Sequence, residues 1–247
     1  MTTKVTNWIK EYCTNSGINH LVIGISGGID SAVVSTLCCE TGVPTTVVSL
    51  PISQKEDQLE RARKHASWLQ SKYNNCTFVE IDLTDVSKLF EQTVSLFKDE
   101  LSDANSRSRL RMVTLYQIAG KRKGLVVGTG NKVEDFGVGF YTKYGDGGVD
   151  ISPIADFTKT EVRQLAKDLG VLDEIIQAKP TDGLWGDDKT DEDQLGATYE
   201  ELEWAMDYVE FGSQREITRR ESDVLAIYKA RNAANKHKMV PIPVFKK

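Results

Sequence analysis

The fold is decided by one short stretch, Leu21-Val22-Ile23-Gly24-Ile25-Ser26-Gly27-Gly28-Ile29-Asp30-Ser31. Its first five residues are apolar or glycine, as in a strand that is buried on both faces. A polar turn with two glycines follows, and the segment SAVVSTLCCET then predicts a helix that ends at Gly42 in the left-handed conformation. A strand, a glycine-rich turn and a helix in this order are typical of a parallel α/β sheet.

The rest of the chain continues the alternation of strand and helix patterns. Further strands are expected at 45–50, 76–81 and 125–127. Helices are expected at the N-terminus, at about 53–73 from a capping box of Ser53 with Glu56, at 83–97 and at 110–121, with a polar stretch at 98–109. Two more helices are expected to begin at the capping boxes Thr158–Glu161 and Thr218–Glu221. The fold class is therefore α/β, with a doubly wound, mostly parallel, Rossmann-like sheet flanked by helices.

Composition restricts the class of protein. The 247 residues, 40% hydrophobic and 27% charged, suit one domain over 1–247. A net charge of −5 argues against a general nucleic-acid surface. No stretch reaches the roughly 20 apolar residues that cross a bilayer, so no membrane partner is expected. The N-terminus lacks an apolar signal core, and the four cysteines have neither disulfide nor zinc spacing, which favours the cytoplasm.

The turn from Ser26 to Ser31 has the features of a phosphate-binding loop. Gly27 and Gly28 let the backbone turn tightly and direct its N–H groups outward, and the following helix adds its positive end. An acid in such a place repels phosphate unless a cation lies between, so Asp30 suggests a shared Mg²⁺. The alternative is a plain turn in which Asp30 caps the helix. The loop is not a Walker A motif, because no Gly-Lys-Ser/Thr follows.

The six-residue loop resembles the SGGxDS pyrophosphate loop of the ATP-pyrophosphatase superfamily, whose members adenylate a substrate and release pyrophosphate. Other segments select one family within it. NSRSRLRM, from Asn105, resembles the NxxARxRM segment of NAD synthetases, with Ser108 in place of Ala. GTGNKVE at 128–134 and GFYTKYGDGG at 139–148 are known to us together only from NAD synthetases. The resemblance runs in order along nearly the whole chain, to Val240-Pro241.

The resemblance implies a set of site residues at the ATP end. Asp30 and Glu134 are expected to bind magnesium, and Lys159, in the FTKTEVRQLAKDLG segment, is expected to approach phosphate. These three, together with Asp146, form the expected catalytic set. The expected ATP-binding residues are Gly24, Ser26, Gly27, Gly28, Ile29, Asp30, Ser31, Gln54, Thr129, Lys159 and Thr181.

A second set is implied at the other end, for nicotinic acid adenine dinucleotide (deamido-NAD). Asp146 is expected at the nicotinate end, where it steers or deprotonates ammonium. The expected substrate-binding residues are Arg109, Phe140, Lys143, Asp146, Asp150, His237 and Lys238. The acidic segment that holds Asp187 and Asp188 is interpreted as a loop that closes over a reactive adenylate.

The chain departs from the family pattern at a few places. The best-known bacterial form has Asp-His where this chain has Gly130-Asn131, and one extra residue lies between Glu134 and the GFYTKYGD segment. Ser49 stands where an Arg is common. These departures bear on the adenine and metal contacts more than on the reaction class.

The implied activity is that of a ligase that forms a C–N bond in NAD biosynthesis. The substrate carboxylate would be adenylated by ATP, and ammonia would then give NAD and AMP, with Mg²⁺ as cofactor. Free ammonia is expected as donor because no glutaminase domain fits before the first strand, unless a separate glutaminase subunit delivers it. The family implies a homodimer with the substrate at the subunit interface. Two rivals remain: another adenylating enzyme, such as a tRNA-thiolating one, and a nucleotide-binding regulatory protein of the same fold.

Overall fold

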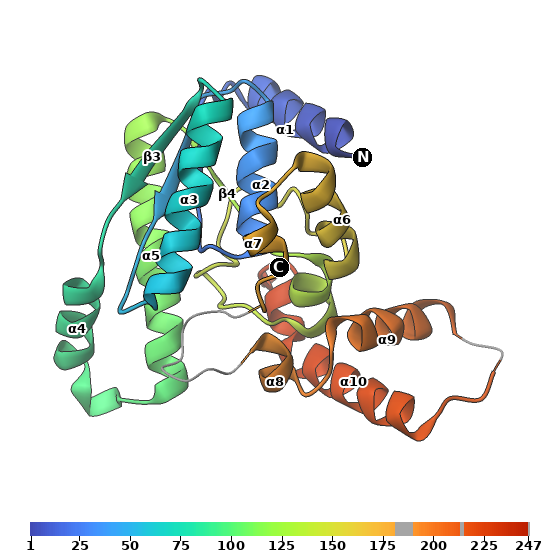
Figure 1. Cartoon of the computed structure of the whole chain (residues 1–247). Helices are drawn as coiled ribbons and strands as arrows, with labels where there is room; N and C mark the ends of the chain where they lie inside the picture. The colour runs from blue at the N-terminus through green and yellow to red at the C-terminus, as the bar shows by residue number, and fades with distance from the viewer. Residues whose placement is uncertain (181–189, 213–214, 247) are drawn as a thin grey trace.

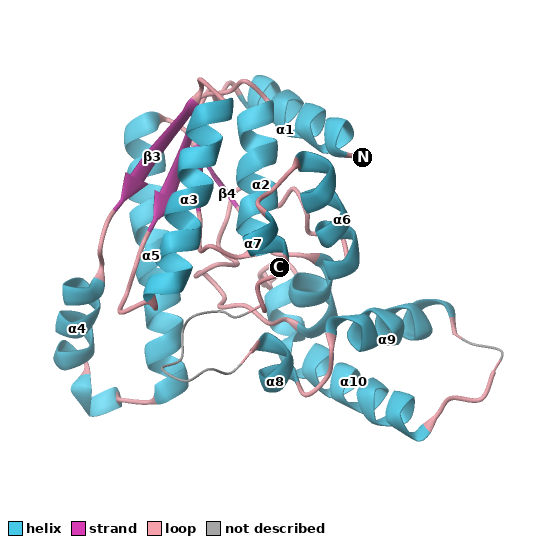
Figure 2. Ribbon diagram, viewed as in Figure 1, coloured by secondary structure: helices cyan, strands magenta, loops and turns pink. Residues whose placement is uncertain are grey.

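A four-stranded parallel sheet forms the centre of the molecule. The computed structural model describes residues 1–180, 190–212 and 215–246. The strands lie in the order β3-β2-β1-β4, with helices on both sides (Figure 1, Figure 2). Their bounds are β1 Leu21–Gly24, β2 Thr45–Ser49, β3 Cys76–Glu80 and β4 Leu125–Val127. The expected fold class is confirmed, and each strand lies within a residue of its predicted bounds.

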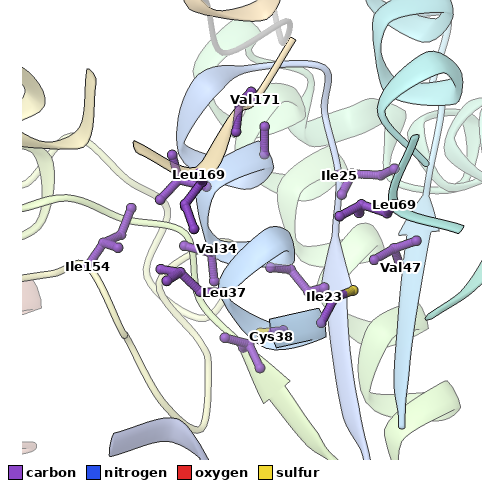
Figure 3. Close-up of a cluster of buried hydrophobic side chains, with 14 of the residues drawn as sticks. Ile23, Ile25, Val34, Leu37, Cys38, Val47, Leu69, Ile154, Leu169 and Val171 are labelled. Atoms are coloured by element: carbon purple, nitrogen blue, oxygen red, sulfur yellow. The ribbon is translucent and has the colours of Figure 1, made fainter. Parts of the chain in front are cut away.

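The two faces of the sheet pack against different helices, because successive strand residues point to opposite sides. Ile23 and Val47 lie in one core with α1 Thr2–Ser16, α2 Ile29–Glu40, α3 Glu56–Lys72 and α6 Lys159–Leu169. In Figure 3, Leu37 of α2 lies between Ile23 on one side and Ile154 on the other. The opposite face, with Val22 and Val48, packs against α5 Glu100–Arg122.

The strand order reverses direction between β1 and β4. From β1 the chain moves outward to β2 and β3, and it then crosses back to place β4 on the other side of β1. In open α/β sheets, ligands bind outside the carboxyl ends of the strands at such a switch point. The turn of residues 26–31 follows β1 and the turn of residues 128–130 follows β4, so the topology brings both glycine-rich turns to this point.

A third core lies away from the sheet. It joins η2 Val133–Val138, a π-helical turn, to α9 Tyr199–Phe211 and α10 Arg219–Met239. In Figure 1, α9 and α10 extend together from the body of the molecule. The connecting segments contain α7 Asp173–Ile176 and α8 Asp191–Leu195. The segment that carries Glu134 is therefore held by a different core from the one that holds the first glycine-rich turn.

Several predicted helix boundaries were right and others were wrong. The capping boxes at Thr158 and Thr218 are confirmed, and the chain turns left-handed at Gly42 with a φ of 77°. The capping box at Ser53 is wrong: Ser53 has a φ of 48°, its N–H donates to Thr84 Oγ1, and α3 begins after Lys55.

Two further boundaries differ from expectation. The predicted helix at 83–97 is divided into α4 Thr84–Thr93 and a 3₁₀ turn, η1 Ser95–Phe97. The polar stretch at 98–109 is helical, because Asp99 accepts the Ser102 N–H and so caps α5 ten residues before its expected start at Leu110.

The cysteines and two of the histidines have structural surroundings. All four cysteines are free, and three of them are buried. His65 is buried and bonds the Ser35 hydroxyl, while His20 bonds Thr46 Oγ1. Among the described residues, no helix has the length and apolar character that a membrane crossing requires.

Candidate active site

One large cavity lies at the switch point of the sheet. Its volume is about 620 Å³, and residues from β1, β2 and β4 line it at their carboxyl ends. Every residue from Ser26 to Ser31 contributes to the wall on one side, and Gly128, Thr129 and Gly130 contribute on the other. The two glycine-rich turns therefore share one cavity, as their positions after strands predict.

The first turn is shaped to present backbone N–H groups. Gly27 has a φ of 82°, and a Cβ there would lie 2.5 Å from the Gln58 carbonyl oxygen, so the position requires glycine. The Ser31 hydroxyl donates to the Gly28 carbonyl at 3.0 Å and accepts from the Ser26 N–H at 3.2 Å, which fixes the turn. The first amides of α2 have no acceptor within their own helix and carry its positive dipole. This arrangement suits a phosphate.

Asp30 does not cap α2. The N-cap is Gly28, without a side-chain bond, and Asp30 lies in the first turn of the helix. Its carboxylate instead accepts hydrogen bonds from Lys159 Nζ at 2.6 Å and from Asn131 Nδ2 at 3.2 Å. The structure thus rules out the plain-turn alternative for Asp30 and directs its charge to the cavity.

Lys159 joins two carboxylates at this point. Its Nζ lies 2.6 Å from Asp30 Oδ2 and 3.1 Å from Glu134 Oε1, and only 3% of the lysine side chain is exposed. Burial lowers the pKa of Lys159, but the charges of Asp30 and Glu134 outweigh burial and hold that pKa above its ordinary value. Burial raises the pKa of Glu134, and the Lys159 charge opposes this. Three of the four predicted catalytic residues, from three distant segments, therefore form one contact group.

Tyr199 extends this group and was missed by the sequence analysis. Its hydroxyl donates to Glu134 Oε1 at 2.6 Å and lies 3.3 Å from Asp191 Oδ2, while Lys159 Nζ lies 4.6 Å from the ring centroid. The tyrosine is fully buried. Burial, followed by the charge of Glu134, raises the pKa of Tyr199 well above its ordinary value, so the phenol keeps its proton. A capping box at Thr198 could have predicted the helix, but no sequence pattern marks the tyrosine as facing Glu134.

Asn131 is a second residue that the sequence analysis missed. It is fully buried, and its Oδ1 accepts the N–H groups of Val133 and Glu134, both at 3.1 Å. Its Nδ2 donates to Asp30, so one amide connects the backbone before Glu134 to the Asp30 carboxylate. An Asn whose side chain accepts the N–H groups two and three residues later is a common cap at the start of a helical turn. This signal could have identified Asn131. The departure at Gly130-Asn131 thus has a structural role at the site.

The other end of the cavity carries the residues expected to meet the substrate. Phe140, Asp146 and Lys238 line it. Ser108 Oγ donates to Asp146 Oδ1 at 2.6 Å, and desolvation by the surrounding protein raises the pKa of this carboxyl, although part of the residue is exposed. Lys238 Nζ donates to the carbonyl oxygens of Gly139 and Tyr141, so it also holds the loop between η2 and Asp146.

Four predicted substrate residues do not line the cavity of this single chain. Arg109 Nε donates to the Lys143 carbonyl at 3.3 Å, and Lys143 Nζ donates to the His237 carbonyl at 2.9 Å. Asp150 accepts the Val126 N–H at 2.7 Å beside β4. Thr181, predicted to contact ATP, lies outside the described residues. The substrate roles of all five stay predictions.

Basic side chains line the cavity where the sequence did not mark them. Arg111 Nε donates to the Leu50 carbonyl at 3.0 Å and lines the wall, whereas the neighbouring Arg109 points elsewhere. On a helix, residues two positions apart face different sides, so only one of these two can reach a given ligand. The other unmarked basic residues of the wall are Arg61, Arg163, Lys179 and Arg231. Acidic residues line the same cavity, so its wall carries both signs of charge, with basic side chains in slight excess in a chain of net charge −5.

Comparisons with known proteins identify the family. The profile of the NAD synthase family matches residues 1–241. The NH(3)-dependent NAD(+) synthetase of Alkaliphilus metalliredigens is 38% identical over 232 residues, which cover 90% of this chain and 89% of the relative.

Two solved structures are similar to this chain over almost their full lengths. The structure of NMN synthetase from Francisella tularensis has a TM-score of 0.89 and 30% identity, covering 100% of this chain and 97% of that one. The NH3-dependent NAD synthetase from Campylobacter jejuni, in complex with the nitrate ion, has a TM-score of 0.81 and 26% identity, covering 99% and 97%. With the family profile matched along nearly all of its length, and with the glycine-rich turns and acidic residues of the family meeting in one cavity, the chain belongs to the NAD synthase family.

Proposed function

We propose that this member of the family amidates deamido-NAD with ammonia, using ATP. The chain is a ligase that forms a C–N bond. The substrate carboxylate attacks the α-phosphorus of ATP, pyrophosphate leaves, and an acyl adenylate forms. Ammonia then attacks the acyl carbon, AMP leaves, and the products are NAD and a proton. The protein supplies no covalent nucleophile; it positions two anionic substrates and offsets their charge.

The observation that carries this proposal is the contact of Lys159 with both Asp30 and Glu134 inside a cavity walled by two glycine-rich turns. A cavity with backbone N–H groups at one end and basic side chains in its wall suits a nucleoside triphosphate. The retention of both carboxylates and the lysine favours turnover over a regulatory protein that only binds nucleotide. Family membership favours NAD synthesis over tRNA thiolation.

The carboxylates of Asp30 and Glu134 fit magnesium. Their oxygens lie within hydrogen-bonding reach of one nitrogen, and 17% and 16% of the two side chains are exposed. Mg²⁺ is usually held by one or two carboxylates, with waters and substrate phosphates completing its shell. Within residues 1–180, 190–212 and 215–246, no group of three or more acidic, His or Cys side chains forms a metal cage. When bound, Mg²⁺ would neutralise charge on the leaving pyrophosphate.

The chain's own residues divide the remaining work between the two ends of the cavity. At the ATP end, the turn from Ser26 to Ser31 orients the phosphates, and Lys159 offers its ammonium group to them. At the other end, Asp146 takes one proton from ammonium and leaves ammonia with a free electron pair facing the acyl carbon. Because Asp146 is exposed, that proton can pass from it to solvent.

Ammonia is proposed as the donor because relatives named NH(3)-dependent match this chain over nine-tenths of both lengths. A separate glutaminase subunit that delivers ammonia is the alternative, and an assay with glutamine tests it. We also propose the cytoplasm as the site of action, since four free thiols suit a reducing compartment. A single domain over 1–247 stays a prediction.

A homodimer is proposed on the basis of exposed apolar side chains on α4, η1 and α5. Large apolar residues with at least 60% of their surface exposed gather here: Leu89, Leu96, Phe97, Leu101 and Val113. Single exposed apolar residues are ordinary, so the proposal rests on their number on three consecutive elements. Light scattering after gel filtration should give twice the chain mass, and Phe97→Glu should give a monomer. A second subunit would also bring new neighbours to Arg109 and Asp150.

The proposal is tested by product formation. Purified protein is incubated with ATP, Mg²⁺, deamido-NAD and either ammonium or glutamine, and NAD and AMP are separated by chromatography. Equal amounts of NAD and AMP with ammonium, and none with glutamine, are expected. Asp30→Asn should abolish turnover, whereas Asp85→Asn, at a fully exposed carboxylate on α4, should not. Folded protein that binds ATP but forms no AMP would contradict the proposal.

A second candidate substrate is nicotinic acid mononucleotide. It is favoured by the TM-score of 0.89 with the NMN synthetase structure, against 0.81 with the Campylobacter NAD synthetase. The chemistry is the same, because the reacting carboxylate is on the same ring. The same assay with the mononucleotide in place of deamido-NAD decides between them by the ratio of kcat/KM values.

A further inference from the structure

Ser108 has an unusual place in this site. It lies on α5, and only 6% of its surface is exposed. Its hydroxyl donates to Asp146 Oδ1 at 2.6 Å, and the same oxygen accepts the Asp146 N–H at 3.0 Å. Ser108 therefore holds both the backbone and the carboxylate of one residue, which an alanine cannot do.

The surroundings leave Asp146 few other orientations. Gly145 has no side chain, and a Cβ there would overlap with Ser108 Oγ, so the hydroxyl fills the space beside the turn. The Thr142 N–H donates to the same Asp146 oxygen at 3.1 Å, and the Thr142 hydroxyl donates to Asn105 Oδ1 at 2.6 Å. Oδ1 is thus engaged on the α5 side, and Oδ2 remains for the cavity.

Three charged or titratable groups face Asp146. Lys238 of α10 is positive and favours the carboxylate, whereas Asp135 of η2 is negative and lines the same part of the cavity. Tyr141 belongs to the same loop as Asp146. Among the described residues, none of these three groups hydrogen-bonds the Asp146 carboxylate, whereas the Ser108 hydroxyl does.

We propose that Ser108 is a positioning residue of the ammonia step, which turns Asp146 so that its second oxygen meets ammonium beside the acyl adenylate. The inference rests on the proposed function. Adenylation takes place at the ATP end of the cavity and does not use this contact. Loss of the hydroxyl should therefore affect the use of ammonium and leave the formation of the adenylate in place.

Ser108→Ala is the test, and two reactions are measured. Exchange of labelled pyrophosphate into ATP, with deamido-NAD and without ammonium, reports adenylation and correct folding. It should stay within about twofold of the parent. The apparent KM for ammonium should rise about tenfold, as expected for one lost hydrogen bond to a charged group. The hydrogen bond from Ser108 lowers the pKa of Asp146, so its loss should move the acidic limb of the pH–rate profile up by about one pH unit.

Ser87→Ala is the matched control. Ser87 is also buried, on α4, and its hydroxyl donates to the Glu91 carboxylate at 3.3 Å, away from the cavity wall. It should change neither the KM for ammonium nor the acidic limb. Unchanged ammonium kinetics in Ser108→Ala overturn the positioning role, and so does a parallel loss of pyrophosphate exchange, which indicates a structural role. A parent protein that forms no NAD at all overturns the proposed function itself.

Discussion

Replacing Lys159 by methionine separates the structural role of this lysine from its chemical one. The alkyl chain is nearly conserved, while two hydrogen bonds to carboxylates, at 2.6 and 3.1 Å, are removed. What remains is a pair of acids, Asp30 and Glu134, whose common counter-ion is gone. The variant tests whether the lysine balances the two carboxylates in the folded protein.

The magnitude follows from burial. With 3% of the lysine side chain and less than a fifth of each acid exposed, the group lies in a largely water-excluded site. Removing one partner from a buried ion pair costs about 3–5 kcal/mol of unfolding free energy, because the remaining charge is uncompensated. Burial already raises the pKa of Glu134, and removal of the lysine charge raises it further. An acid with a raised pKa in the folded state destabilises it as pH rises, so the loss should be larger at high pH.

The assay is equilibrium unfolding by urea, followed by circular dichroism, with EDTA and then with excess Mg²⁺. In EDTA, the free energy of unfolding of Lys159→Met should be about 3–5 kcal/mol lower than that of the parent protein. Mg²⁺ should restore part of the lost free energy of unfolding, because a cation that binds the two acids only in the folded protein stabilises the folded state. The control is Lys88→Met, a lysine that is 63% exposed and 3.9 Å from Asp85, with an expected change within about 0.5 kcal/mol. A loss below about 1 kcal/mol in EDTA refutes the reasoning.

Three further predictions concern separate parts of the molecule. Tyr199→Phe removes the hydroxyl that donates to Glu134 and keeps the buried ring, so turnover should fall about tenfold; unchanged kinetics would show that the hydroxyl is dispensable. Thr218→Ala removes the cap of α10 and should lower the unfolding free energy by about 1 kcal/mol, whereas Thr218→Ser should keep it. Burial lowers the pKa of His65 to about 4 from 6.5, so the folded state loses on the order of 3 kcal/mol as pH falls through that window. In urea unfolding, His65→Gln should lose less unfolding free energy than the parent as pH falls. The same dependence of unfolding free energy on pH in both proteins would contradict the lowered pKa of His65.

Local patterns were sufficient to predict the sheet. The β1 stretch is apolar at every position but Gly24, and the strand is buried from Leu21 to Ile23, so composition and environment agree. The strand order was not predictable, because β3 and β4 have equally suitable sequences for either edge. Order depends on which helices cover which face, and those contacts join residues far apart in the chain.

The start of α5 shows how a polar surface conceals a helix. Residues 98–109 lack the apolar period that marks an amphipathic helix, and most of their side chains are at least partly exposed. Asp99 caps this helix by accepting the Ser102 N–H, and the sequence analysis missed that signal. The error matters for the site, because Ser108 and Arg111 lie on this helix and meet the cavity only if it is continuous.

Asp30 could be proposed from its own surroundings, because an acid in a glycine-rich turn needs an explanation that packing does not give. Glu134 and Lys159 were proposed through the resemblance to NAD synthetases. Tyr199 could not be proposed, because a tyrosine at the start of a helix is most often part of a core. Here it is both: its ring packs with η2 and α10, and its hydroxyl reaches Glu134. Only the three-dimensional arrangement distinguishes such a residue from an ordinary core residue.

The two acids of the site are held by different cores. Asp30 is on α2, which packs on the sheet, while Glu134 is on η2, which packs on α9 and α10. Lys159, at the first position of α6, contacts both acids, and the Asn131 amide connects the same two segments. A small displacement of α9 and α10 relative to the sheet would therefore change the separation of the carboxylates before it changed either core. It follows that substitutions in the α9–α10 core, far from any substrate atom, should alter Mg²⁺ dependence more than they alter ATP binding.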